Sequence, residues 1–163
     1  MIAKLNRLSR WPRIILLGCA LGVVFVMIDL AIFGHFERIA YLAPFKLSDE
    51  PVKQELERVI GSQLAAFRNG DYNRAYGYAD STLRQTFAPS AFREMVRTSY
   101  PAIAASASAT YGIIFDNGRI AMVMVGITSH TGNVLHYEYL LRREPTGWRI
   151  SGVTRIRPQT TTI

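Results

Sequence analysis

The sequence predicts an α+β domain held behind one N-terminal transmembrane helix. Three observations support this: positions 14–33 are almost continuously apolar, apolar residues at 52–100 recur every three or four positions, and from 107 onward they alternate. A helical period followed by a strand period is typical of an α+β fold. We expect about three helices packed on a bent, four-stranded antiparallel meander sheet.

The apolar run, Ile14 to Phe33, contains one charged residue, Asp29, and no proline. A helix rises about 1.5 Å per residue, so about 20 apolar residues cross a hydrocarbon core of about 30 Å. The sequence therefore divides into a leader at 1–13, a transmembrane helix at 14–36, a connector at 37–49, a domain at 50–157 and a tail at 158–163.

The charges around the run predict its orientation. Lys4, Arg7, Arg10 and Arg13 precede it with no acidic residue among them, and basic flanks stay in the cytoplasm. We expect a bacterial inner-membrane protein with its N-terminus in the cytoplasm and its domain in the periplasm. Part of the net charge of +7 therefore comes from the residues that set the orientation of the membrane helix. The charge is then weak evidence for nucleic-acid binding, and no nucleic-acid partner is expected.

Two cleavable signals are alternatives to an anchor. A secretory signal has an apolar core of about 7–15 residues and an A-x-A-like site, but this run is longer, and Ala40 and Ala43 are badly spaced. Residues 16–19 superficially resemble a lipoprotein signal, but only four apolar residues separate Arg13 from Gly18. An uncleaved anchor fits better.

Inside the run, Gly18 and Gly22 share one helical face, which would let another helix approach closely. Glycine is also common in membrane helices, so the spacing leaves helix packing open. Asp29 is a candidate functional residue because polar groups in spans are costly. Its place near the outer end favours a carboxylate that reaches the headgroups. The expected partners are the lipid bilayer and a membrane protein.

Helix signals follow the connector. The first helix has an N-cap at Ser48 or Asp49 and ends at Asn69-Gly70, since both end residues tolerate the left-handed conformation. Its inward positions recur at helical spacing. The other expected segments are a short helix capped by Asp71, a turn at 83–87 and a last helix from Pro89 to Tyr100.

Strand signals fill the rest of the domain. The strand at 119–129 is apolar on both faces, which predicts a central place in the sheet. If Leu135 and Leu141 define the core face, Tyr137 and Tyr139 point inward. The expected strands are 107–115, 119–129, 134–143 and 148–156, joined by turns at 116–118, 130–133 and 144–147, with a bulge at Gly152.

Several short motifs resemble a known family. They are Gln63-Leu64-Ala65-Ala66-Phe67, Asp71 with Ala75-Tyr76, Phe92 with Met95-Val96 and Tyr100, and the run at 147–152. Over roughly residues 52–156 the chain resembles the bacterial domain-of-unknown-function family 4864. The resemblance implies a nuclear-transport-factor-2-like, cystatin-like cone fold and no established activity. The same cone behind one span is used by VirB-type secretion scaffold proteins, which is an analogy only.

Enzymes with this cone place an acid or histidine with tyrosine in a pocket between helices and sheet. Here Asp80 is explained by helix capping, and His136 and Glu138 face outward if Tyr137 faces inward. We therefore expect no catalytic residue, and the spacing of the three histidines suggests neither a metal nor a cofactor. The candidate pocket residues are Tyr76, Phe92, Tyr100, Tyr111, Tyr137 and Tyr139.

A group of arginines follows along the last two strands. They could meet anionic headgroups or an acidic partner, or they could simply protect an edge strand from aggregation. We slightly favour protection. The residues are Arg142, Arg143, Arg149, Arg155 and Arg157.

Two classes of function remain. The first, which we prefer, is an extracytoplasmic interaction module that serves as an accessory or assembly subunit of a larger membrane complex. The alternative is a small-ligand binder or an isomerase- or dehydratase-like enzyme at the outer membrane face. A filled cone with an exposed apolar patch would favour the first class, and an open aromatic pocket would favour the second.

Overall fold

The computed structural model describes residues 44–157. The chain divides into a unit at 1–43 and a unit at 44–163. The expected leader, transmembrane helix and tail, with Gly18, Gly22 and Asp29, lie outside the described residues. Within 44–157, no helix is both long and apolar enough to cross a membrane.

The sheet has five antiparallel strands that lie side by side in chain order. The α+β prediction is confirmed, but the predicted number of strands was one too low. The additional strand, β1, pairs only with the end of β2 and is too short to show an alternating pattern. The strands are β1 (Lys46–Leu47), β2 (Ser106–Asp116), β3 (Ile120–Ser129), β4 (Val134–Glu144) and β5 (Gly147–Arg155).

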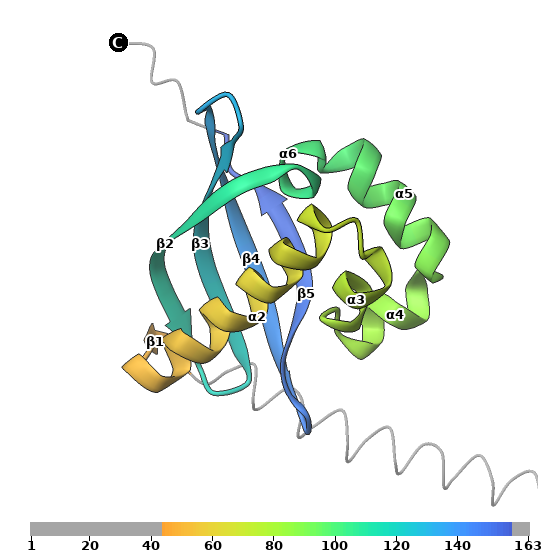
Figure 1. Cartoon of the computed structure of the whole chain (residues 1–163). Coiled ribbons are helices and arrows are strands. Elements are labelled where there is room, and N and C mark those ends of the chain that lie inside the picture. The colour runs from red at the N-terminus through yellow and green to blue at the C-terminus, as the bar shows by residue number, and fades with distance from the viewer. Residues whose placement is uncertain (1–43, 158–163) are drawn as a thin grey trace, which may run out of the picture. The chain divides into compact units, whose positions relative to one another are not determined.

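Five helices are described where about three were expected. Pro101 ends α5 as predicted, but it also starts the one-turn helix α6, because proline is tolerated at the first helical position. Figure 1 shows α2 crossing one face of the sheet, with α3, α4 and α5 grouped beyond β5 and α6 between α5 and the start of β2. The helices are α2 (Glu50–Arg68), α3 (Tyr72–Gly77), α4 (Ser81–Thr86), α5 (Pro89–Ser99) and α6 (Pro101–Ala104).

Side-chain caps set the starts of the short helices. The Asp71 carboxylate accepts a hydrogen bond from the Arg74 backbone N–H at 2.9 Å and so caps α3, as predicted. Asp80 caps α4 in the same way, through the Leu83 N–H at 2.7 Å. Asp49 holds the N-cap position of α2 but makes no capping bond with its side chain. Its carboxylate instead accepts a hydrogen bond from Lys46 at 2.8 Å.

The core lies between α2 and the inner face of the sheet. Leu56, Ile60 and Leu64 repeat at helical spacing along α2 and are at most 1% exposed. They share one hydrophobic core with alternate residues of β3, whose central place in the sheet was predicted correctly. The buried residues of β3 are Ala121, Val123, Val125 and Ile127.

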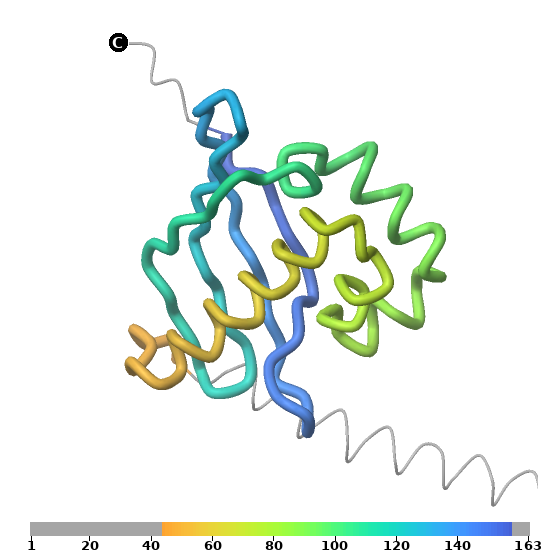
Figure 2. The backbone as a smooth tube through the Cα atoms, in the orientation of Figure 1, coloured from red at the N-terminus to blue at the C-terminus, as the bar shows by residue number. Residues whose placement is uncertain are grey.

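The alternation expected along β2 is wrong at its far end. The register with β3 shifts between Tyr111 and Ile114, so one extra residue separates two inward positions. Ile114 is therefore buried, whereas Ile113 is 57% exposed. In the tube of Figure 2, β2 bends along its length.

Candidate functional site

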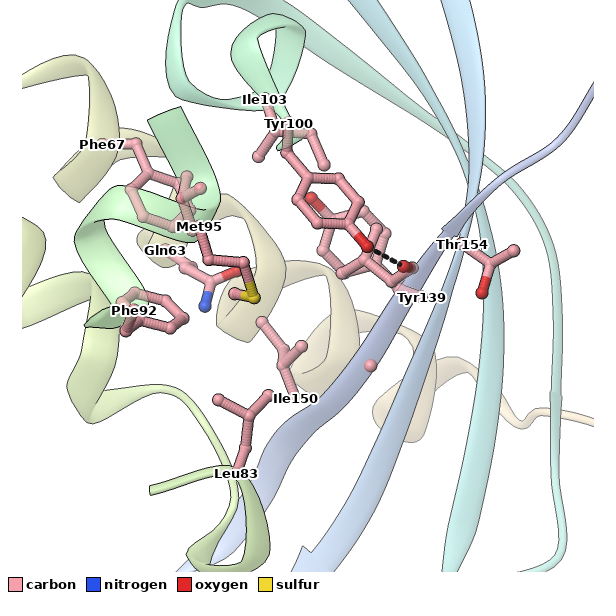
Figure 3. A pocket seen from close by; sticks show the side chains of 13 residues that line it. Gln63, Phe67, Leu83, Phe92, Met95, Tyr100, Ile103, Tyr139, Ile150 and Thr154 are labelled. Atoms are coloured by element: carbon pink, nitrogen blue, oxygen red, sulfur yellow. Dashed lines mark hydrogen bonds between the residues drawn. The ribbon is translucent and has the colours of Figure 1, made fainter. Parts of the chain in front are cut away.

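A cavity of about 260 Å³ opens between the helices and the last two strands. Figure 3 shows Phe92, Met95 and Leu83 on the helical side, with Ile150 on β5. Its lining is almost entirely apolar or aromatic, which is the usual character of a small-molecule site. The lining residues are Gln63, Phe67, Leu83, Phe92, Met95, Val96, Tyr100, Ile103, Tyr139, Ile150, Gly152, Val153 and Thr154.

Two aromatic rings, those of Phe67 and Phe92, belong to the wall on the helical side, and Tyr76 supports them from outside the lining. The rings of Phe67 and Phe92 stack with centroids 6.1 Å apart. Tyr76 meets Phe92 edge to face at 5.3 Å. Such contacts stabilise each ring beyond its burial alone, so the wall is held in place before any ligand arrives.

The predicted pocket residues divide into two groups. Phe92, Tyr100 and Tyr139 line the cavity, whereas Tyr76, Tyr111 and Tyr137 do not. The Tyr76 hydroxyl is used by the helices, since it donates toward the backbone carbonyl oxygens of residues 84 and 87. The Tyr111 hydroxyl donates to the Glu57 carbonyl on α2. Tyr137 is buried, as predicted, but it does not belong to the cavity lining.

Tyr100 crosses from the helices to the sheet. It lies where α5 ends and α6 begins, and its hydroxyl donates to the Val153 carbonyl on β5 at 3.0 Å. Figure 3 shows this bond beside the ring of Tyr139. The bond joins the α5–α6 junction to the strand opposite and so limits how far the cavity can widen.

Tyr139 brings a polar group into this apolar region. Its side chain is 0% exposed, and no hydrogen-bond partner of its hydroxyl lies among the described residues. Burial, with a smaller contribution from Tyr111 and Tyr137, raises the pKa of Tyr139 well above its ordinary value. The group therefore stays protonated at neutral pH and is a potential hydrogen-bond donor.

Gln63 lines the cavity but was not among the pocket residues predicted from the sequence, although its inward helical position could have indicated it. Gln63 lies three residues after Ile60 and four before Phe67, on the inward face of α2. Its side-chain N–H donates to the Ala75 carbonyl at 3.2 Å, so the amide is held within the core. A polar residue at an inward helical position indicates either such a bond or a ligand contact.

Among residues 44–157, no charged side chain lines the cavity. Asp80 is used in capping, and His130 and His136 are exposed outside the lining. Within residues 44–157 no group of three or more His, Cys, Asp or Glu could hold a metal ion.

The five arginines do not form one free basic surface. Arg142 lies 3.7 Å from the carboxylate of Asp80. Arg143 pairs with Glu55 at 3.8 Å and stacks on Trp148. Arg149 donates to the Trp148 carbonyl and to the Thr146 hydroxyl, and the side chains of Arg155 and Arg157 are exposed.

The segment at 78–81 positions one wall of the cavity. Its backbone pairs with the edge of β5, through the Asp80 N–H to the Ile150 carbonyl and the Ile150 N–H to the Tyr78 carbonyl, both at 2.9 Å. The Glu144 carboxylate accepts a hydrogen bond from the Ser81 N–H at 2.7 Å. These bonds fix the start of α4, which carries the lining residue Leu83.

Glu144 should make stability depend on pH. Burial by itself raises the pKa of Glu144, but the hydrogen bonds from Ser81 and the charges of Arg84 and Arg149 lower it overall below its ordinary 4.5. A carboxyl group whose pKa is lower in the folded chain than in the unfolded chain stabilises the fold at pH values above its unfolded pKa. This contribution is lost as the pH falls below 4.5. We expect Glu144→Gln to reduce the loss of stability on acidification.

The measurement is urea unfolding of both chains at pH values from about 7 to about 3. The difference between wild type and Glu144→Gln should be largest at neutral pH and should shrink below 4.5. Equal acid sensitivity in the two chains would contradict this assignment.

Comparison with known protein families identifies the family of the domain. The family model described as "Domain of unknown function (DUF4864)" matches residues 49–163. The chain belongs to this family. The match includes all of the cavity lining and confirms the resemblance seen in the motifs, and it assigns this DUF4864 domain no activity.

Among solved structures, the DUF4864 domain is similar to a crystal structure from Streptomyces avermitilis that is described as a candidate dehydratase of the NTF2-like family. The identity is 11%, the TM-score is 0.46, and the similarity covers 65% of this chain and 95% of the other. No curated protein matches the sequence.

Proposed function

We propose that this chain is a membrane-held module whose DUF4864 domain binds a small ligand in the cavity between the helices and β5. The observation that carries the proposal is an open cavity whose lining is largely apolar and aromatic. This is the second of the two classes of function that the sequence left open. The absence of an acid or base from the lining favours binding over isomerase- or dehydratase-like chemistry.

The size of the cavity supports a ring-sized ligand. An engineered apolar cavity of about 150 Å³ in another protein binds benzene, and this one measures about 260 Å³. Sites for drug-sized ligands begin at about 300 Å³. A ligand of two fused rings or a short branched chain therefore fits.

The membrane part of the proposal rests on the sequence. The apolar run at 14–33 and the four basic residues before it support an inner-membrane anchor with the domain in the periplasm. A ligand-binding domain in that place would take its ligand from the periplasm or from the outer leaflet.

The test uses the full-length chain, prepared from carbonate-washed membranes and kept in dodecyl maltoside micelles. Isothermal titration with 2-isopropenylnaphthalene should show binding beyond that of empty micelles. Met95→Trp should weaken this binding by about tenfold or more, because the indole would occupy the cavity that Met95 lines.

The matched control is Met122→Trp. Met122 is half-buried on the outer face of β3, opposite Leu140, so the same substitution there should leave binding unchanged. Two results would overturn the proposal. Recovery of the chain in the carbonate wash would contradict the membrane anchor. Equal binding by Met95→Trp and wild type would contradict the cavity as the binding site.

The accessory-subunit role is a second candidate, and one observation favours it. On the outer face of the sheet, Met124 and Leu140 are each 37% exposed, and Ile113 is 57% exposed nearby. Where exposed apolar side chains join into one patch, that patch often docks a protein. That role does not use the cavity, so it should survive in Met95→Trp.

A further inference from the structure

We propose that the cavity selects a ring-shaped ligand that carries a hydroxyl or N–H group, and that this group donates a hydrogen bond to the side-chain oxygen of Gln63, Oε1. The inference rests on the proposed function and adds the chemical class of its ligand. Two observations carry it: the Gln63 amide is held in one orientation, and its oxygen is accessible from the cavity.

The side-chain amide of Gln63 is held in one orientation. Gln63 lies on the inward face of α2, where it is 4% exposed. Its Nε2 atom donates to the backbone carbonyl oxygen of Ala75 at 3.2 Å. A carbonyl oxygen only accepts, so the amide would lose this bond if its nitrogen and oxygen exchanged places. The nitrogen therefore faces Ala75, and the oxygen is left for another partner.

The Gln63 oxygen is accessible and has no partner among residues 44–157. In that range, the buried side-chain atoms with neither a partner nor accessible surface belong to Asp80, Tyr139 and Trp148. Gln63 Oε1 accepts no hydrogen bond in that range but is not one of these atoms, so it keeps accessible surface. Because Gln63 lines the cavity, that surface faces the cavity. In Figure 3 the oxygen lies toward Met95, another lining residue.

A ligand that fills the cavity decides whether this oxygen is paired. Water can enter the open cavity and donate to Gln63 Oε1. A purely apolar ligand would displace that water and leave a buried acceptor without a donor, which is costly. A ligand hydroxyl or N–H group would restore the bond. A site with a fixed polar group therefore rejects an analogue that lacks the matching group.

Two aromatic rings place a ligand ring beside this oxygen. Phe67 lies four residues after Gln63 on the same face of α2. Its ring stacks on that of Phe92, with the centroids 6.1 Å apart. Flat rings pack well against such faces in offset or edge-to-face contact. A ligand ring that packs there can bring its substituent to Gln63.

The other polar side chains of the lining match this role less well. The Tyr100 hydroxyl is engaged by the Val153 carbonyl at 3.0 Å. The Tyr139 hydroxyl has no accessible surface. Thr154 is exposed, so water competes for its hydroxyl. Gln63 is thus the buried side chain of the described lining that best matches a ligand donor.

Three naphthalenes that differ in one substituent test the proposal. They are 2-naphthol, whose hydroxyl donates; 2-methylnaphthalene, whose methyl group neither donates nor accepts; and 2-methoxynaphthalene, whose oxygen only accepts. Each is titrated by calorimetry at neutral pH into the full-length chain in dodecyl maltoside micelles. The heat of partitioning into empty micelles is measured separately and subtracted.

In wild type, 2-naphthol should bind about tenfold more tightly than 2-methylnaphthalene, and 2-methoxynaphthalene no more tightly than 2-methylnaphthalene. Gln63→Met removes the oxygen and keeps a side chain of similar length, so it should bring the ratio of naphthol affinity to methylnaphthalene affinity close to one. Gln54→Met is the matched control, because Gln54 lies on the same helix but is exposed, bonded to Glu50 and outside the lining. Its ratio should equal that of wild type.

Gln63→Met also removes the bond to Ala75, so near-ultraviolet circular dichroism checks that the variant is folded. If it is not, the three probes decide the point in wild type, where methoxynaphthalene binding as tight as naphthol binding would overturn the inference. An unchanged ratio in folded Gln63→Met, or a fall confined to Thr154→Val, would overturn it too. In each case the ligand-binding function stands. Failure of all three probes to bind wild type would overturn the proposed function as well.

Discussion

Arg142→Ala should lower the free energy of unfolding by about 2–3 kcal/mol. The Asp80 carboxylate is 1% exposed, and Arg142 is the cation beside its Oδ2 atom, 3.7 Å away. That oxygen accepts no hydrogen bond from any described residue. Removing the guanidinium would leave a buried charge uncompensated, and the exposure of Arg142 keeps the expected cost below that of a fully buried pair.

Urea unfolding followed by near-ultraviolet circular dichroism measures this effect. Arg155→Ala is the matched control, because Arg155 is exposed on the neighbouring strand and should cost at most about 0.5 kcal/mol. The double variant Asp80→Asn/Arg142→Ala should recover part of the loss, since it removes the buried charge. Equal costs for Arg142→Ala and Arg155→Ala would show that the ion pair contributes nothing.

Trp148→Ala should cost about 3–5 kcal/mol, the range for removing a fully buried aromatic side chain. Trp148 is 0% exposed and is the largest side chain in the core. The Arg143 guanidinium covers its ring at 5.4 Å from the centroid, so truncation also removes that cation–π contact. A loss of this size approaches the whole stability of many domains, and we expect the variant to unfold at a much lower urea concentration.

Trp148→Phe separates packing from polarity. The indole N–H is buried with no hydrogen-bond partner among the described residues, so phenylalanine loses volume but no hydrogen bond. Its cost should be about 1–2 kcal/mol. If both variants proved equally unstable, or if Trp148→Ala unfolded like wild type, the ring would not hold the core as described.

Local signals predicted much of the fold because they depend on neighbours in sequence. Asp71 and Asp80 cap their helices through N–H groups three residues ahead. Gly118 takes a φ of 81° in the hairpin between β2 and β3, as a tight turn requires. The bulge at Gly152 was also predicted, and the register between β4 and β5 shifts beside it. Short-range chemistry decides these features, so the sequence reveals them.

The candidate site was only partly predictable. Alternation placed Tyr137 and Tyr139 on the inner face, and both are buried. Alternation could not separate the lining residue Tyr139 from Tyr137 beside the cavity, because that depends on where α5 and α6 pack. The arginines show the same limit. Asp80, the partner of Arg142, lies 62 positions earlier in the chain (142 − 80), and no local sequence pattern spans that separation.

The sequence by itself determined the order of helices before the four long strands, the caps of α3 and α4, the central place of β3 and membership in the family. Only the tertiary structure decided that a cavity stays open between the helices and β5, that the buried Tyr139 hydroxyl has no partner among the described residues, and that Arg142 lies beside a buried acid. Periodicity and capping arise between residues a few positions apart. A cavity and an ion pair arise where elements distant in the chain pack together, so their geometry exists only once the fold has formed.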